Sequence, residues 1–112
     1  MAISVDQVDE ALTALADGTR RQILDVLARR GEATATLLAD EVPVSRQAVV
    51  KHLAVLDGAG LVRGQRLGRE VRYSVRPVRL VQIARWMAQL AAQWDTRLAA
   101  IKRIAEATED DN

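Results

Sequence analysis

The stretch that decides the fold is residues 43–57, PVSRQAVVKHLAVLD. Pro43 cannot continue a preceding helix, and the hydroxyl of Ser45 is suited to cap the start of a new one. Apolar residues then recur at helical spacing and predict a buried face: Val49, Leu53 and Leu56. The opposite face carries Arg46, Gln47, Val50, Lys51 and Ala54. Gln and Arg suit hydrogen bonds to base edges, and Ser and Lys suit phosphates, so this helix is predicted to lie on DNA.

A short basic hairpin is predicted directly after this helix. Residues 61–76, LVRGQRLGREVRYSVR, contain two strand-forming segments separated by Gly68, which can adopt the positive φ of a tight turn. The segment carries five arginines: Arg63, Arg66, Arg69, Arg72 and Arg76. In its second half the apolar side chains alternate to one side: Val71, Tyr73 and Val75. A helix suited to DNA followed by a basic hairpin is the order of a winged helix-turn-helix.

The segments before the DNA helix are also predicted to be helical. Residues 5–16 carry an apolar stripe, and Ser4 and Gln7 have the spacing of a capping box. A second helix at about 19–30, capped by Asp17 or Thr19, ends at Gly31. A short third helix begins at Thr34 or Thr36 and ends near Val42. The predicted fold class is therefore mainly α with a small β-hairpin wing: four helices, two strands and a fifth helix.

The fifth helix is predicted to be long, from about residue 78 to 107, or about 45 Å. Its apolar positions step by threes and fours: Leu80, Ile83, Met87, Leu90, Trp94, Leu98, Ile101 and Ile104. A small core cannot cover this whole face, so we expect a homodimer in which it meets the same helix of a second copy. The predicted dimer interface comprises Val8, Leu12, Ile83, Trp86, Met87, Leu90, Trp94, Leu98 and Ile101. Packing inside the monomer, or a hydrophobic ligand pocket, remain alternatives for Trp86 and Trp94.

Size and composition fit one small cytoplasmic domain. The chain has 112 residues and no cysteine, which excludes disulfides and thiolate metal sites. No apolar run approaches the roughly 20 residues needed to span a bilayer, and the N-terminal residues lack the pattern of a signal peptide. We expect a DNA-binding and dimerisation domain over residues 1–107 and an acidic, disordered tail over 108–112. No membrane partner is predicted.

The small net charge conceals a strongly basic middle segment. The formal net charge is +1, but residues 1–45 carry −4, residues 46–85 carry +7 and residues 86–112 carry −2. A polyanion interacts with the local charge rather than with the total. The basic segment coincides with the predicted DNA helix and hairpin, which supports nucleic acid as the partner.

The sequence resembles the ArsR/SmtB family of winged-helix repressors. The resemblance covers about residues 10–90 and rests on three segments: ALADGTRRQILDVL, VSRQAVVKHLAVLDGAGLV and GREVRYSV. It implies a homodimer whose first and last helices form the interface. It also implies binding to a near-palindromic operator, often over the regulator's own promoter, and release of DNA when an inducer binds.

The resemblance also implies which residues contact DNA. Ser45, Arg46, Gln47, Val50 and Lys51 match the DNA-facing positions of the family's recognition helix. Many relatives have Ser where Val50 stands, and a valine can instead contact a thymine methyl group. His52 matches a frequent His-Leu pair, and Arg66, Arg69 and Arg72 fall where relatives touch the backbone or minor groove.

The known metal sites of the family are not matched by this sequence. Metal sensors carry cysteines near the helix before the recognition helix, and the corresponding segment here, LLADEVPVS, has none. Others place Asp and His pairs on the last helix, which here offers Asp95 and Glu106 but no histidine. The single histidine, His52, is interpreted as a packing or phosphate-contacting residue. No metal or other cofactor is predicted.

The sequence therefore predicts a sequence-specific DNA-binding transcriptional regulator. The expected form is a homodimeric repressor of its own or a neighbouring promoter, with double-stranded DNA and a second copy as partners. Two alternatives stay open: a winged-helix protein-interaction module, and a regulator that binds a small-molecule effector in a pocket at the dimer interface. An enzyme is not predicted, because no Gly-rich phosphate loop or acid–base pair is present.

Overall fold

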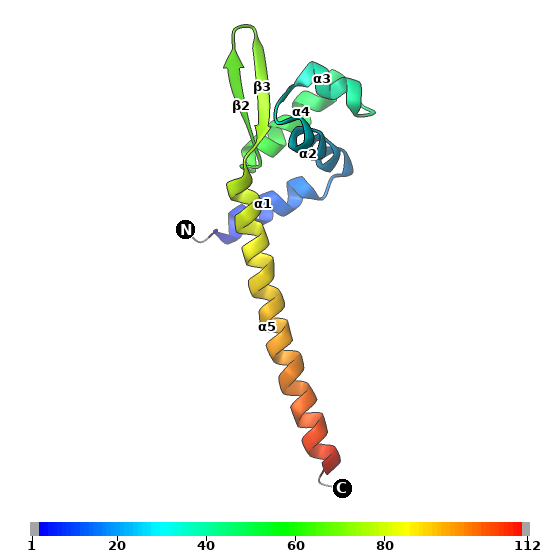
Figure 1. The fold of residues 1–112 in the computed structure, drawn as a ribbon, viewed down its shortest axis with the longest axis vertical. Coiled ribbons are helices and arrows are strands. Elements are labelled where there is room, and N and C mark those ends of the chain that lie inside the picture. Colours follow the sequence, from blue (N-terminus) through cyan, green and yellow to red (C-terminus); the bar gives the residue numbers. More distant parts are fainter. Residues whose placement is uncertain (1–2, 111–112) are drawn as a thin grey trace.

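A winged-helix body and one long helix extending from it make up the computed structural model, which describes residues 3–110 (Figure 1). The elements in chain order are α1 (Val5–Leu15), α2 (Gly18–Arg30), β1 (Ala33–Thr34), α3 (Ala35–Glu41), α4 (Arg46–Gly58), β2 (Val62–Leu67), β3 (Glu70–Val75) and α5 (Pro77–Asp110). The overall extents are 75 × 31 × 22 Å, because α5 projects far beyond the body. The predicted fold class and element order are confirmed, with one strand added.

Side chains cap the starts of the first four helices. The predicted capping box between Ser4 and Gln7 is present at the start of α1. Two possible caps were predicted for each of the next two helices; the structure shows that Asp17 caps α2 and Thr34 caps α3. Ser45 caps α4 as predicted. Each capping oxygen accepts a hydrogen bond from the backbone N–H three residues later, at 3.0–3.2 Å. These bonds satisfy N–H groups that have no partner within their own helix.

The Asp17 cap predicts a pH dependence of stability. Its hydrogen bond from the backbone N–H of Arg20 is the main cause that holds the pKa of Asp17 below the ordinary value of 3.8. A carboxylate with a lowered folded-state pKa stabilises the protein above the unfolded-state pKa, and this stabilisation is lost as pH falls through the folded-state pKa. We expect Asp17→Asn, which still caps a helix, to lose less free energy of unfolding on acidification than the wild type. Urea titrations over a pH series check this, and parallel pH profiles would contradict it.

The sheet has three antiparallel strands in the order β1-β3-β2. The predicted hairpin is confirmed, with pairs running from Val62–Val75 to Leu67–Glu70, and Gly68 at its tip has φ +66°. The added strand β1 pairs with β3 through Ala33 and Thr34 and continues directly into α3. The wing is therefore attached along one edge to the segment that begins the helix-turn-helix.

The main core lies between α2, α3, α4 and the base of the wing. Its largest fully buried side chains are Ile23, Leu27, Leu38, Val49, Leu53, Leu56, Leu61 and Val62. The predicted apolar face of α4 is thus confirmed, and α4 is held against the body by that face. Its opposite face remains open to solvent.

Two arginines at the start of α2 fasten the end of α1. Arg20 donates from Nε to the carbonyl oxygen of Ala14 at 2.7 Å and from Nη2 to that of Thr13 at 3.2 Å. Arg21 donates from Nη1 to the carbonyl oxygen of Leu15 at 2.6 Å. Carbonyls in the last turn of a helix lack intrahelical partners, so these bonds satisfy them and fix the angle between α1 and α2.

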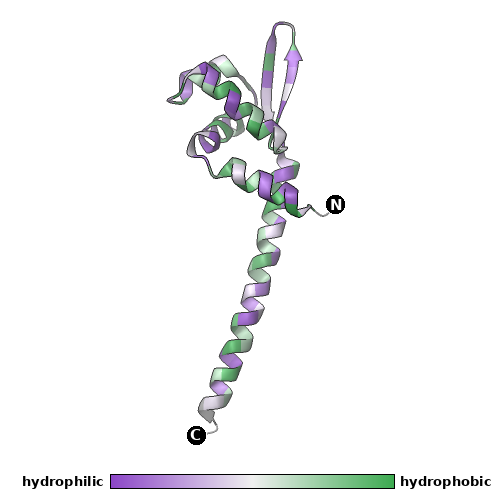
Figure 2. Ribbon diagram, turned by 180° about the vertical axis from the view of Figure 1, so that it is seen from behind, coloured by the Kyte–Doolittle hydropathy of each residue, from purple (hydrophilic) through white to green (hydrophobic). Residues whose placement is uncertain are grey.

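The helix α5 is anchored at its beginning and uncovered beyond. Val8 and Ala11 of α1 pack with Ile83 of α5 in a second buried cluster, with Trp86 partly buried beside it. Beyond that contact, α5 presents the exposed stripe, in which every side chain is 41–67% exposed: Met87, Leu90, Trp94, Leu98, Ile101 and Ile104. Figure 2 shows hydrophobic residues recurring along α5 to its far end.

The end of α5 differs from the prediction. The helix continues to Asp110, past the expected end at residue 107, because residues 106–110 contain no helix-breaking Gly or Pro. Of the tail expected to be disordered over 108–112, residues 108–110 are therefore helical, and 111–112 lie outside the described residues. In residues 3–110, no helix has a stretch apolar enough and long enough to cross a bilayer.

Candidate nucleic-acid interface

The outer face of α4 holds most of the predicted DNA contacts. Ser45, Arg46, Gln47, Val50 and Lys51 are all exposed. Ser45 caps the helix, Gln47 and Lys51 lie opposite the buried face that packs into the core, and Arg46 and Val50 line the side of α4 that faces the wing. Rigid packing on one face and polar side chains on the other make α4 suited to insertion into a major groove.

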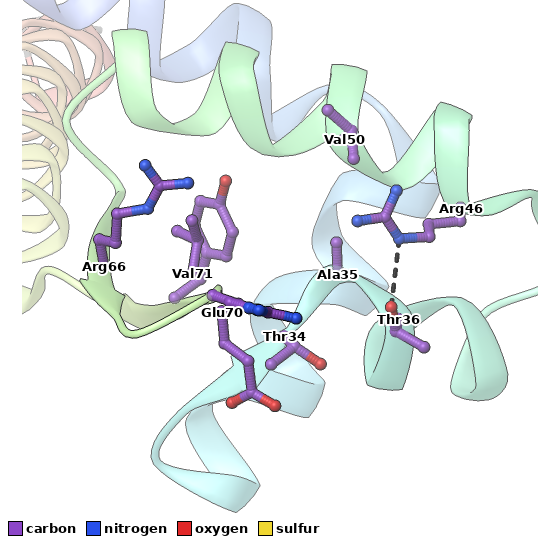
Figure 3. A pocket seen from close by; sticks show the side chains of 10 residues that line it. Thr34, Ala35, Thr36, Arg46, Val50, Arg66, Glu70 and Val71 are labelled. Atoms are coloured by element: carbon purple, nitrogen blue, oxygen red, sulfur yellow. Dashed lines mark hydrogen bonds between the residues drawn. The ribbon is translucent and has the colours of Figure 1, made fainter.

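A groove separates the first half of α4 from the wing and has a volume of about 630 Å³ (Figure 3). We call it the wing groove. Its lining residues are Thr34, Ala35, Thr36, Arg46, Val50, Arg66, Arg69, Glu70, Val71 and Tyr73. Arg46 and Val50 come from α4, and Arg66 faces them from β2 (Figure 3). The structure thus brings together DNA contacts predicted on the helix with two of the three predicted on the wing.

The arginines of the wing groove carry uncompensated positive charge. No ion pair joins Arg46, Arg66 or Arg69 to another residue in the described part of the chain. The one acidic residue of the lining, Glu70, pairs with Arg72, and its carboxylate points away from α4 (Figure 3). Three unpaired guanidinium groups around one concave surface attract a polyanion.

Arg72 lies away from the wing groove, although it was predicted to contact DNA. Side chains alternate along a strand, so Arg72 points to the face opposite Val71 and Tyr73. Its Nη1 lies 3.0 Å from Oε1 of Glu32, and its Nε lies 3.5 Å from Oε2 of Glu70. The hydrogen bond and charge of Glu32, followed by those of Glu70, raise the pKa of Arg72. Its charge is already balanced within the chain.

His52 also differs in position from the other predicted contacts. The side chain is half-buried, and its Nδ1 lies 3.4 Å from Nη1 of Arg20, the arginine that fastens α1. His52 therefore connects α4 to the start of α2, whereas Gln47 and Lys51 are exposed on α4. Of the two roles left open for this histidine, packing fits its surroundings better.

The tryptophans of α5 have different environments. Trp86 is partly buried against the cluster formed by α1 and α5, so its role includes packing inside the protomer. Trp94 is 54% exposed, and the guanidinium carbon of Arg97 lies 5.3 Å from its ring centre. Among the side chains of residues 3–108, no three His, Asp or Glu residues are grouped as a metal ion would need.

Two residues of the wing groove, Thr36 and Tyr73, were not predicted from the sequence. Thr36 of α3 hydrogen-bonds Arg46, and Tyr73 of β3 lines the wing groove, but neither was a candidate site residue. Nothing in the spacing of Thr36 indicates this contact, because it depends on how α3 and α4 are packed. The alternation of the wing strand did contain a signal for Tyr73, since it shares the face of Val71.

Comparisons with known proteins agree with this arrangement. A family described as a helix-turn-helix domain matches residues 15–65. The HTH-type transcriptional regulator Rv2034 of Mycobacterium tuberculosis is 37% identical over 103 residues, which cover 92% of each chain. The solved structure of an ArsR-like transcriptional regulator from Rhodococcus sp. RHA1 has a TM-score of 0.82 and 44% identity, covering 89% of this chain and 93% of that one.

A further solved structure extends the comparison to a protein described as a dimer. It is the homodimeric winged helix-turn-helix DNA-binding domain Mb0332 from Mycobacterium bovis, a possible ArsR-family regulator. The TM-score is 0.62 and the identity 32%, with coverage of 84% of this chain and 83% of that one. Fold, sequence and element order therefore place this chain in the ArsR/SmtB family of winged helix-turn-helix transcriptional regulators.

Proposed function

We propose that this regulator is a homodimeric, sequence-specific DNA-binding repressor. The observation that carries the proposal is the wing groove, where unpaired arginines of α4 and of the wing lie beside the exposed face of α4. In a two-fold dimer, the two α4 helices enter successive major grooves about 34 Å apart. Each wing then reaches the adjacent backbone or minor groove.

The exposed side chains of α4 suggest a division of roles on DNA. Ser45 and the N–H groups of the first turn of α4 face a phosphate, which the positive end of the helix dipole favours. Gln47 and Lys51 read base edges in the major groove, and Val50 packs on a thymine methyl group. On the wing, Arg66 and Arg69 hold the sugar–phosphate backbone.

The exposed stripe supports the second half of the proposal, dimerisation through α5. Six large apolar side chains, each more than two-fifths exposed, lie along one face of a single helix. A two-fold interface brings the same patch of both copies together and removes that area from water. The proposed interface comprises Leu12, Trp86, Met87, Leu90, Trp94, Leu98 and Ile101. Val8 and Ile83, which are 3% and 4% exposed, support it from within the protomer.

Repression follows from the position of such a dimer on DNA. A protein that occupies the grooves of a promoter blocks access of RNA polymerase, and the family resemblance implies this mode on the regulator's own or a neighbouring promoter. The site of action is then the cytoplasm, where bacterial promoters lie. The Mycobacterium bovis domain with 32% identity is described as homodimeric and DNA-binding, which supports both parts of the proposal.

Fluorescence anisotropy on a labelled fragment from upstream of the protein's own gene tests the proposal. The titration is repeated with random competitor DNA and over a salt series, and light scattering gives the stoichiometry. We expect competitor-resistant binding by two protomers per site and a steep loss of affinity with salt. Binding that is insensitive to salt and equal on all DNA would contradict the proposal.

Gln47→Ala is expected to relax sequence preference more than it lowers overall affinity. An amide that pairs with a base edge contributes about 1–3 kcal/mol of discrimination, and a dimer loses two such contacts, so operator binding should weaken by about 30-fold or more. Binding to random DNA should hardly change. Gln89→Ala provides a matched control, because Gln89 is exposed on α5, away from α4. Equal weakening on operator and random DNA would show that Gln47 does not read bases.

A further inference from the structure

The side chain of Arg46 lies in the wing groove, together with Val50 of the same helix. Its Nε donates a hydrogen bond of 3.1 Å to Oγ1 of Thr36, which belongs to the first turn of α3 (Figure 3). Gln47 and Lys51, by contrast, are exposed on α4 and are not part of the groove lining. Arg46 is thus directed toward the wing side of α4.

The bond to Thr36 determines which donors of Arg46 remain free. A guanidinium has five N–H donors, and Nε uses its single one on the hydroxyl. The four N–H groups of the two terminal nitrogens stay available to a ligand in the wing groove. An unanchored arginine has many rotamers, so this contact also restricts the directions in which those donors point.

The side of the wing groove formed by the wing also carries guanidinium groups. Arg66 and Arg69 contribute two more guanidinium groups, and like Arg46 they take part in no ion pair within residues 3–108. Guanidinium groups bind phosphate oxygens through paired N–H donors. The groove therefore presents donors for one phosphodiester segment from two sides, the recognition helix and the wing.

The geometry of duplex DNA places a phosphodiester strand between these two sides. One backbone strand separates each major groove from the adjacent minor groove. A protein with α4 in the major groove and the wing at the minor groove must therefore straddle that strand. The wing groove is the space between α4 and the wing.

We propose that Arg46 is a phosphate clamp rather than a base reader, and that Thr36 is the residue that positions it. This inference rests on the proposed function and refines it, because sequence reasoning grouped Arg46 with the base-reading residues. Arg46 then contributes affinity and salt dependence on every DNA sequence. Sequence discrimination comes from Gln47, Lys51 and Val50.

Four variants of the full chain test the proposal on operator and random DNA over a salt series. Arg46→Ala removes the clamp, Thr36→Val removes only the hydroxyl, and Thr36→Ser retains it. Thr96→Val is the matched control, because the Thr96 hydroxyl donates to a carbonyl within α5, away from the wing groove. Thermal melting of each variant by circular dichroism verifies that its fold is retained.

The expected results separate a clamp from a base reader. Arg46→Ala should weaken binding to operator and random DNA by the same factor. It should also flatten the slope of log affinity against log salt concentration by about 1.8 per dimer, since two phosphate contacts are lost. Thr36→Val should weaken binding to both DNAs about 30-fold, because each of the two protomers loses one hydrogen bond, and Thr36→Ser should restore most of that affinity. Thr96→Val should have the affinity and the salt dependence of the wild type on both DNAs.

Four outcomes would overturn the assignment. A loss of operator preference in Arg46→Ala with an unchanged salt slope would identify Arg46 as a base reader. Wild-type affinity in Thr36→Val, or no recovery in Thr36→Ser, would show that Thr36 does not position it. If the wild type itself shows no salt-dependent DNA binding, the proposed function fails, and the clamp fails with it.

Discussion

Replacing both Leu90 and Ile101 with Glu is expected to convert the dimer into monomers. In a two-fold interface the double substitution removes four large apolar side chains, each contributing about 1.5–3 kcal/mol when buried. The summed loss of about 6 kcal/mol or more raises the dissociation constant of the dimer by at least about four orders of magnitude. The body should remain folded, because both side chains are exposed in the protomer, at 41% and 61%.

Sedimentation velocity over a concentration series measures this dissociation. The matched control is Ala92→Glu with Ala99→Glu, which adds the same charges to exposed positions about half a helical turn from the exposed stripe. We expect the control to remain dimeric and to bind operator DNA normally. The Leu90 and Ile101 variant should bind as a monomer, with about half the salt slope. A stable dimer of that variant would place the interface elsewhere on the chain.

Replacing both Arg66 and Arg69 with Ala is expected to reduce the salt dependence of DNA binding strongly. A dimer loses four phosphate contacts, so the slope of log affinity against log salt should flatten by about 3.6. The affinity should fall by a similar factor on operator and on random DNA, because phosphate contacts carry no base information. Anisotropy titrations at several salt concentrations measure both quantities.

Arg72→Ala is the matched control for this wing variant. Arg72 is on the same hairpin, but its charge is balanced by Glu32 and Glu70 on the face away from the wing groove. For Arg72→Ala we therefore expect the slope of log affinity against log salt concentration to change by less than about 1. If Arg72→Ala flattened the slope as much as the double variant does, the far face of the wing would be the one that contacts DNA.

Most of the fold could be predicted from the sequence because its signals are local. The hydroxyl of Ser45 and the glycine at position 68 each act within three or four residues, and both predictions are confirmed; the same holds for the cap of α2, where the structure selects Asp17 from the two residues that the sequence left open. The strand β1 was missed for the same reason. Two residues have no periodic pattern, and Ala33 becomes a strand residue only because Tyr73 pairs with it from 40 positions away.

The candidate site was harder to predict because charge balance and direction depend on distant residues. On sequence, Arg66, Arg69 and Arg72 are equivalent, yet Glu32 pairs with only the last of them. Likewise, the contact of His52 with Arg20 and that of Arg46 with Thr36 each join two helices. Val8 and Ile83 lay on correctly identified apolar faces, but the sequence did not indicate that these faces bury them against each other within one protomer.

The short strand β1 has a thermodynamic consequence for association with DNA. An isolated two-stranded hairpin is only marginally stable in water, whereas here a third strand, continuous with α3, holds the wing in place before any ligand arrives. Association then orders little of the polypeptide, so it avoids the large negative heat-capacity change that accompanies coupled folding and binding. Calorimetry should therefore record a heat-capacity change that matches the surface covered by DNA alone, as expected for rigid-body docking.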